Sequence, residues 1–105
     1  MKAIINGLRY DTEKATLIGE YHTPGLGHNN FQYWTAALYK TPRSGIFFLT
    51  GEGHAMTRFA SHSGDSSGWG SKVIPMSKKE ALEWAEQYLD AEDFEEHFAD
   101  AIEEA

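Results

Sequence analysis

Residues 77–104, SKKEALEWAEQYLDAEDFEEHFADAIEE, decide the fold of this chain. Ser77 followed by Glu80 is a capping-box pattern, in which each side chain satisfies a free backbone N–H at the start of a helix. At 100° per residue, Glu80, Glu83 and Glu86 fall on one side of this helix. The opposite arc is apolar and consists of Ala81, Leu82, Trp84, Ala85, Tyr88 and Leu89. The pattern therefore predicts a helix that buries one face and exposes an acidic one.

A second amphipathic helix is predicted to follow, with Asp90 as its N-cap. Its buried stripe is expected to consist of Phe94, Phe98, Ala101 and Ile102. Its exposed side is expected to carry Glu92, Glu96, Asp100 and Glu103. These acids recur at steps of three and four residues, so a continuous helix would set their carboxylates in a line roughly 5–6 Å apart.

The residues before the helices predict β-strands. Asn6-Gly7 stands between two short apolar runs, which is the strongest short-range signal for a hairpin. We nevertheless expect the main hairpin to fold about residues 11–14, with Asn6-Gly7 as a bulge or kink within its first strand. The returning strand would cover residues 15–21, which include β-branched Thr16 and Ile18.

Three further strands complete the predicted sheet. The aromatic-rich segment 31–40 favours a strand over a short helix. The unbroken apolar run of residues 46–50, IFFLT, predicts a central strand that is buried on both faces. Residues 72–76 predict a last short strand that Pro75 stops. The fold class is therefore α+β, a single domain over 1–105, with an antiparallel sheet of four to five strands (about 1–76) before two C-terminal acidic amphipathic helices (about 77–104).

Glycine-rich segments predict turns and loops. Residues 22–30 are expected to form a loop, and Gly51 and Gly53 are expected to form a turn that needs positive φ. Residues 61–71, SHSGDSSGWGS, predict a mobile or function-carrying loop in which Trp69 is the exception to the polar composition.

Composition limits the classes of protein that fit. A chain of 105 residues, 41% of them hydrophobic, is one domain with room for a real core. It has no cysteine, which excludes a disulfide framework and a thiolate zinc site and fits the cytosol. The apolar stretch near the N-terminus is too short for a signal peptide, and no run approaches a membrane span. We therefore expect a cytoplasmic protein.

Charge is divided unevenly along the chain. Residues 80–105 hold eleven carboxylates and no lysine or arginine, whereas residues 1–79 hold five acids and nine bases. The two parts carry −11 and +4, which add to the formal net charge of −7. Such a division is typical of a chain that presents a negative surface to a basic partner. It argues against direct binding of DNA through the acidic part.

The sequence carries only weak motifs for catalysis or metal binding. The five histidines, His22, His28, His54, His62 and His97, show no HExxH or paired i, i+4 spacing. Gly64-Asp65-Ser66-Ser67-Gly68 looks like a protease nucleophile segment, but the chain offers no base or oxyanion hole around it. We therefore expect no enzyme, no cofactor and no metal. If the protein were an enzyme, the 61–71 loop with His54, His62 and Asp65 would be the place for an active site.

The acids of the predicted helices are the best candidates for a partner-binding surface. With the loop tryptophan, the candidate residues are Glu92, Glu96, Asp100, Glu103, Glu83, Glu86 and Trp69. Arg43 and the Tyr33/Trp34 pair could extend it, because arginine and aromatic side chains anchor interfaces. The same acidic pattern is also typical of a solvated, solubilising face. Trp84 is expected to belong to the core.

Three stretches resemble a set of small bacterial proteins carried on phages and other mobile elements. They are Asn6-Gly7-x-x-Tyr10-Asp11-Thr12-Glu13-x-Ala15, Leu38-Tyr39-x-Thr41 running on to Phe48-Leu49-x-Gly51-Glu52-Gly53, and Ile74-Pro75-Met76-Ser77-x-x-Glu80-Ala81-x-x-Trp84. The chain is also similar to type II-A anti-CRISPR proteins. That resemblance implies a type II CRISPR effector nuclease as partner, alone or with its guide RNA, and an inhibitory outcome. The resemblance does not assign a function to any particular residue of this chain. The alternative is a non-enzymatic acidic interaction or regulatory domain of a mobile element with another basic partner.

Overall fold

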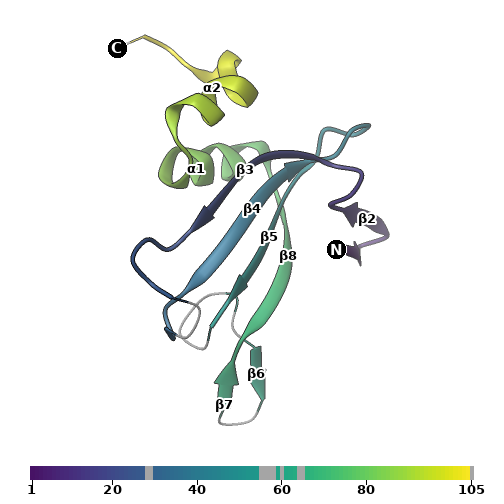
Figure 1. Ribbon diagram of the computed structural model, residues 1–105. Coiled ribbons are helices and arrows are strands. Elements are labelled where there is room, and N and C mark those ends of the chain that lie inside the picture. The colour runs from purple at the N-terminus through teal and green to yellow at the C-terminus, as the bar shows by residue number, and fades with distance from the viewer. Residues whose placement is uncertain (28–29, 55–58, 60, 64–65, 105) are drawn as a thin grey trace.

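The computed structural model describes residues 1–27, 30–54, 59, 61–63 and 66–104, and the side chains of 61–63 and 66–68 are not part of the description. The elements are β1 (Lys2–Ile5), β2 (Leu8–Asp11), β3 (Thr16–His22), β4 (Trp34–Lys40), β5 (Phe47–Gly53), β6 (Ser61–Ser63), β7 (Ser66–Gly68), β8 (Gly70–Met76), α1 (Lys78–Tyr88), α2 (Ala91–Phe98) and the 3-10 helix η1 (Ala99–Ala101). The predicted α+β fold is confirmed: a four-stranded antiparallel sheet and a separate N-terminal hairpin precede two C-terminal helices (Figure 1).

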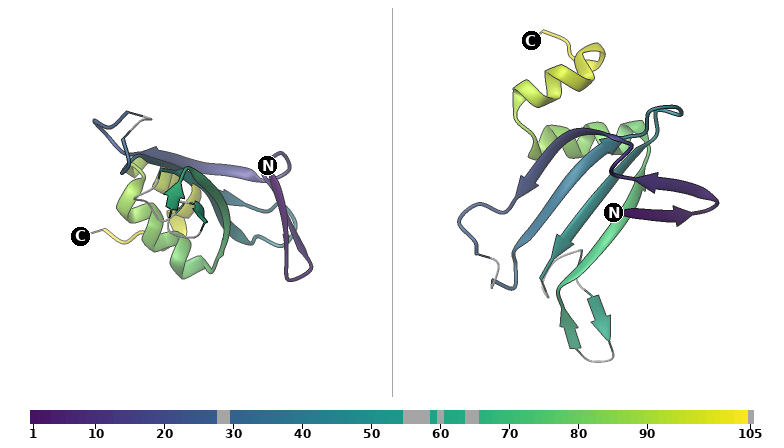
Figure 2. Two further views of the ribbon diagram at one scale, coloured as in Figure 1. Left: turned by 90° about the horizontal axis from the view of Figure 1, so that it is seen from below. Right: turned by 45° about the vertical axis from the view of Figure 1, so that its right-hand side comes forward.

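The main sheet has the strand order β3-β4-β5-β8, so β5 is an inner strand, as its apolar sequence predicts. Phe47 and Leu49 belong to the core that the helices cover. Phe48, which alternates with them, has its ring centroid 5.3 Å from that of Tyr10 in β2. The helices therefore lie on one face of the sheet and the β1–β2 hairpin lies against the other (Figure 2). This arrangement confirms that β5 is buried on both faces.

The core consists of apolar side chains from the sheet and from both helices. Trp84 and Ala85 of α1 and Phe98 of α2 are buried against it. The remaining buried members are Ile18, Ala36, Leu38, Phe47, Leu49, Phe59 and Ala81. Full burial of one large apolar side chain contributes about 1.5–3 kcal/mol relative to exposure. The predicted apolar arc of the first helix and the core position of Trp84 are both confirmed.

The N-terminal hairpin corrects one prediction. Asn6-Gly7 joins β1 to β2, with Ile5 opposite Leu8, so it is the hairpin turn itself and not a bulge. Asn6 and Gly7 have φ of 51° and 80°, the positive values that a two-residue type I′ turn requires. Residues 12–15 form a turn between β2 and β3, but these two strands do not pair. The preference of Asn-Gly for a two-residue turn therefore sets the register between β1 and β2.

The expected turn at Gly51 and Gly53 is also wrong, because both residues lie within β5. Neither has positive φ. A Cβ atom at Gly51 would collide with the ring of Phe59, which is fully buried. Glycine is required here because an aromatic ring packs on the backbone, a second common reason for glycine within a strand.

The segment before the helices is more ordered than expected. The predicted loop 61–71 contains the short strands β6 and β7 and the start of β8. Pro75 does not stop β8 but pairs with Phe48 within it. Proline is tolerated because β8 is an edge strand, and its outer side needs no ladder hydrogen bond. The expected strand at 31–40 is confirmed as β4, although it begins at Trp34.

Candidate partner-binding surface

The first helix holds its acids in fixed positions. The predicted capping box is present: Ser77 N donates to Glu80 Oε1 at 3.0 Å, and Glu80 N donates to Ser77 Oγ at 3.1 Å. Burial of Trp84 and Ala85 sets the rotation of α1 on the sheet. Glu83 and Glu86 are therefore exposed, as the sequence pattern predicts.

The second helix begins as expected. Asp93 N donates to Asp90 Oδ1 at 2.9 Å, so Asp90 caps α2. Phe98 is buried, and its ring centroid lies 5.6 Å from that of Phe47 at the start of β5. With this face turned inward, Glu92 and Glu96 are exposed.

The expected line of four carboxylates on one helix is wrong beyond Phe98. The backbone of Phe98 has φ −132° and ψ 32°, far from helical values, and only the short 3-10 helix η1 follows it. Asp100 lies in η1 and Glu103 lies after it. Ala101 and Ile102, expected in the buried stripe, are exposed for the same reason. Regular spacing therefore holds for Glu92 and Glu96 alone among the four.

One of these acids also has a basic partner. Lys78 Nζ in the first turn of α1 lies 3.5 Å from Asp100 Oδ2. Residues 80–105 contain no lysine or arginine, and the fold brings in a lysine from just outside that segment. Glu83, Glu86, Glu92 and Glu96 have no ion pair with lysine or arginine among the residues that the structure describes. The same holds for Glu103, so Asp100 is the only one of the six candidate acids that a described lysine or arginine offsets.

A groove between α1 and α2 was not foreseen. It encloses about 360 Å³, and Ala85, Leu89, Phe94 and Ile102 give it an apolar floor. Glu86, Asp90 and Glu95 line the same groove. No sequence signal pointed to it, because Ile102 was expected in the buried stripe and is instead 39% exposed. Only the packing of the two helices shows that these residues enclose one groove.

A second depression extends the acidic surface onto the sheet. It encloses about 530 Å³ between β3 and α2, and it is lined by Glu20, Asp93 and Glu96 together with His97. His97 Nε2 lies 4.0 Å from Glu96 Oε2. Glu20 is a strand residue outside the acidic segment, so the helical pattern did not point to it.

Trp69 is not part of this acidic surface. Its ring stacks on Tyr33, with centroids 6.0 Å apart and planes 17° apart, and it is 38% exposed. Trp69 precedes β8 at the end of the sheet where Gly70 pairs with Gly53. Phe98 of α2 contacts Phe47 at the other end of β5, about 20 Å away for a strand of this length. Tyr33, expected to be exposed, is buried.

The residues considered for catalysis or metal binding are only partly described. His54 is half-buried, and its ring lies 5.0 Å from that of Phe31 and 6.1 Å from that of Trp69. His28, Asp65 and the side chains of His62, Ser66 and Ser67 lie outside the described residues. Within the described part of the chain, no group of three or more histidines and carboxylates is placed to hold a metal ion.

Comparison with known protein families, curated proteins and solved structures finds no match to this chain. Among its described residues, no helix is long and apolar enough to cross a membrane. Support for a function therefore comes from the fold and from the surface chemistry of the residues themselves.

Proposed function

We propose that this protein binds and inhibits a type II RNA-guided nuclease, as an anti-CRISPR protein in the cytoplasm of a bacterial host cell. Its acidic helical surface, made of Glu83, Glu86, Glu92, Glu96, Asp100 and Glu103, would occupy a basic nucleic-acid groove of the nuclease. The supporting observation is the concentration of exposed carboxylates on α1, on α2 and just after α2. Of these six, only Asp100 has a lysine or arginine partner within the described part of the chain.

The partner's chemistry fits such a surface. RNA-guided nucleases hold nucleic acid in positively charged channels and must bind DNA before they cut it. A negative surface would be attracted to such a channel, and complementary charge accelerates encounter. Salt screens the attraction, with a Debye length of about 10 Å at 0.1 M. Inhibition should therefore weaken as the salt concentration rises.

The helices are also suited to hold four of these charges, those of Glu83, Glu86, Glu92 and Glu96, in place. Both are capped and both are anchored in the core, α1 through Trp84 and α2 through Phe98. Carboxylates on such a rigid support lose less conformational freedom on binding than carboxylates on a disordered tail. This favours a folded inhibitor that blocks a groove over a flexible polyanion.

The test is a DNA-cleavage titration of the guide-loaded nuclease at low and moderate salt. The wild-type protein should inhibit to saturation near a fixed ratio, because a binding protein titrates its partner. Reversing Glu92, Glu96, Asp100 and Glu103 to lysine should abolish inhibition while the circular dichroism spectrum stays unchanged. Full potency of this quadruple variant would refute the groove-blocking mechanism. Inhibition at substoichiometric amounts with turnover would indicate an enzyme.

A matched control separates surface position from overall charge. Glu13 is exposed in the turn between β2 and β3. Glu13→Lys and Glu96→Lys change the net charge equally, so only the second should weaken inhibition. Equal losses from both would mean that net charge, and not the helical surface, acts on the nuclease.

The groove between α1 and α2 favours a second candidate function. Its apolar floor and acidic lining match a short basic peptide segment with one apolar anchor. The protein would then be a regulatory domain of a mobile element that binds another basic protein. In that case nuclease activity would be unaffected, and a Phe94→Glu variant would lose the partner.

A further inference from the structure

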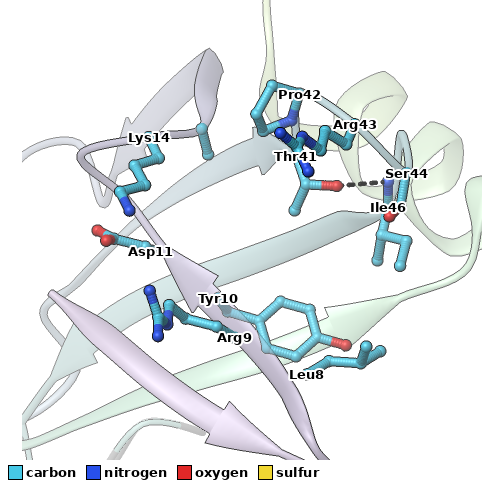
Figure 3. A pocket seen from close by; sticks show the side chains of 11 residues that line it. Leu8, Arg9, Tyr10, Asp11, Lys14, Thr41, Pro42, Arg43, Ser44 and Ile46 are labelled. Carbon is cyan, nitrogen blue, oxygen red and sulfur yellow. Dashed lines mark hydrogen bonds between the residues drawn. The ribbon is translucent and has the colours of Figure 1, made fainter.

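The face of the sheet away from the helices holds a cavity of opposite charge. It encloses about 380 Å³ and is lined by β2, the turn that follows it and the loop between β4 and β5 (Figure 3). This volume lies in the range of small-ligand sites in proteins. None of its lining residues belongs to the acidic helical surface.

Three cations from separate chain segments line this cavity: Arg9, Lys14 and Arg43. Asp11 is the one carboxylate among the lining residues, so their formal charge is +2. In Figure 3 the side chains of Arg9 and Lys14 extend toward Asp11, and Arg43 lies on the other side of the cavity, beside Thr41. No carboxylate oxygen of the described residues lies within 4.0 Å of these three cations. The cavity therefore has cationic donors that no ion pair within the described part of the chain occupies.

Two ordered turns present Lys14 and Arg43, and strand β2 presents Arg9. In the β4–β5 loop, Thr41 N donates to Ile46 O at 2.9 Å, and Ile46 N donates to Thr41 Oγ1 at 2.9 Å. In the turn after β2, Lys14 N and Ala15 N donate to Asp11 O at 3.2 and 3.1 Å. Because both turns are closed by hydrogen bonds, little ordering would be needed when a ligand binds.

The rest of the lining is mainly apolar. Leu8, Pro42 and Ile46 contribute aliphatic surface, and Tyr10 contributes its ring. Leu8 is 48% exposed, so part of its apolar surface is open to a ligand in the cavity. An inorganic anion would use the cations alone, whereas an organic anion would also cover this apolar surface.

We propose that this cavity binds an organic phosphate of nucleotide size, either free or as the terminal unit of a single strand. An arginine fork binds phosphate oxygens in pairs, so Arg43 would hold the phosphate, while Arg9 and Lys14 would add positive charge from the side of Asp11. The apolar lining would contact the organic part. This site is independent of the acidic helical surface and of any action on a nuclease.

The first test is isothermal titration calorimetry with adenosine monophosphate, inorganic phosphate and adenosine as separate probes. Adenosine monophosphate should bind at one site, more tightly than either of the other two. Arg43→Ala should weaken its binding at least about tenfold, which is the effect of losing one charge-assisted contact. A 5′-phosphorylated dinucleotide that binds more tightly than the mononucleotide would identify the strand end as the source of the phosphate.

Lys79→Ala is the matched control, because Lys79 is an exposed cation in the first turn of α1. It should leave adenosine monophosphate binding unchanged, and Leu8→Ala should weaken the nucleotide more than inorganic phosphate. Absence of binding at millimolar nucleotide would overturn the proposal. Equal losses from Arg43→Ala and Lys79→Ala would do the same, as would equal affinity for inorganic phosphate and the nucleotide.

Discussion

Lys78 Nζ lies 3.5 Å from Asp100 Oδ2. This ion pair links the first turn of α1 to the 3-10 helix η1, which follows α2 in the chain. Their side chains are 59% and 75% exposed, so water screens the attraction. Exposed ion pairs of this kind contribute about 0–1 kcal/mol. The pair therefore matters less for stability than for the charge pattern, because it neutralises one carboxylate of the acidic helical surface.

The first prediction concerns this pair. Asp100→Asn should change the free energy of unfolding by less than about 1 kcal/mol. It should also weaken binding of a basic partner less than Glu96→Gln, because Lys78 already offsets the Asp100 charge. The measurement is partner affinity by calorimetry together with urea denaturation. In a Lys78→Ala background the two substitutions should become similar, and an unchanged difference there would contradict the pairing.

The second prediction concerns the contact between Gly51 and Phe59. Gly51→Ala should lower the free energy of unfolding by about 1–3 kcal/mol, because the new methyl group must displace a buried ring. Gly27→Ala is the control, since a Cβ there meets no atom within 4 Å and the backbone has no positive φ. Urea denaturation of both variants measures the difference. Equal stability of both would show that the ring does not pack on this strand.

The third prediction compares two tryptophans. Trp84 is 6% exposed within the core, and Trp84→Ala should lower the free energy of unfolding by about 3–5 kcal/mol. Trp69→Ala removes a partly exposed ring stacked on Tyr33, and should cost only about 0.5–1.5 kcal/mol. Denaturation followed by circular dichroism measures both. A larger loss for Trp69 would contradict its place at the sheet surface.

The fourth prediction concerns pH. The Ser77 backbone N–H, followed by the Ser77 hydroxyl, holds the pKa of Glu80 below its ordinary value of 4.5. Because the folded-state pKa is lowered, the stabilisation is present above pH 4.5 and is lost as the pH falls through the folded-state pKa. Glu80→Gln should therefore show a smaller loss of stability on acidification below pH 4.5. Thermal unfolding across this range measures it. Ser77→Ala, which removes the hydroxyl but keeps the backbone N–H, should reduce the acid dependence only in part.

Much of the fold could be predicted because its signals are local. The capping box at Ser77, the apolar arc around Trp84 and the Asp90 cap each depend on residues within one or two turns. The misplaced Asn6-Gly7 turn is an exception, because its local signal was correct. The error at Gly51 comes from a contact that the strand itself does not encode. Gly51 was assigned to a turn because Phe59, which requires the glycine, lies on another segment of the chain.

Some residues of the candidate sites could likewise be predicted from local patterns, whereas others come together only through packing. The exposed acids of α1 and α2 follow from helical periodicity, so Glu83, Glu86, Glu92 and Glu96 could be named in advance. The groove beside Phe94 depends on how two helices meet, and no spacing within either helix encodes it. The basic cavity joins Arg43 to Arg9 and Lys14, and about thirty residues separate Arg43 from the other two, so no local motif connects them.

The sequence by itself determined the α+β class, the inner position of β5, both helix starts and the concentration of negative charge, because periodicity, capping and composition act over a few residues. Only the tertiary structure decided that the helices and the N-terminal hairpin cover opposite faces of the sheet, that Lys78 meets Asp100, and that Trp69 lies apart from the acidic helical surface. These relationships depend on which apolar faces pack together. Packing brings together residues that lie far apart along the chain.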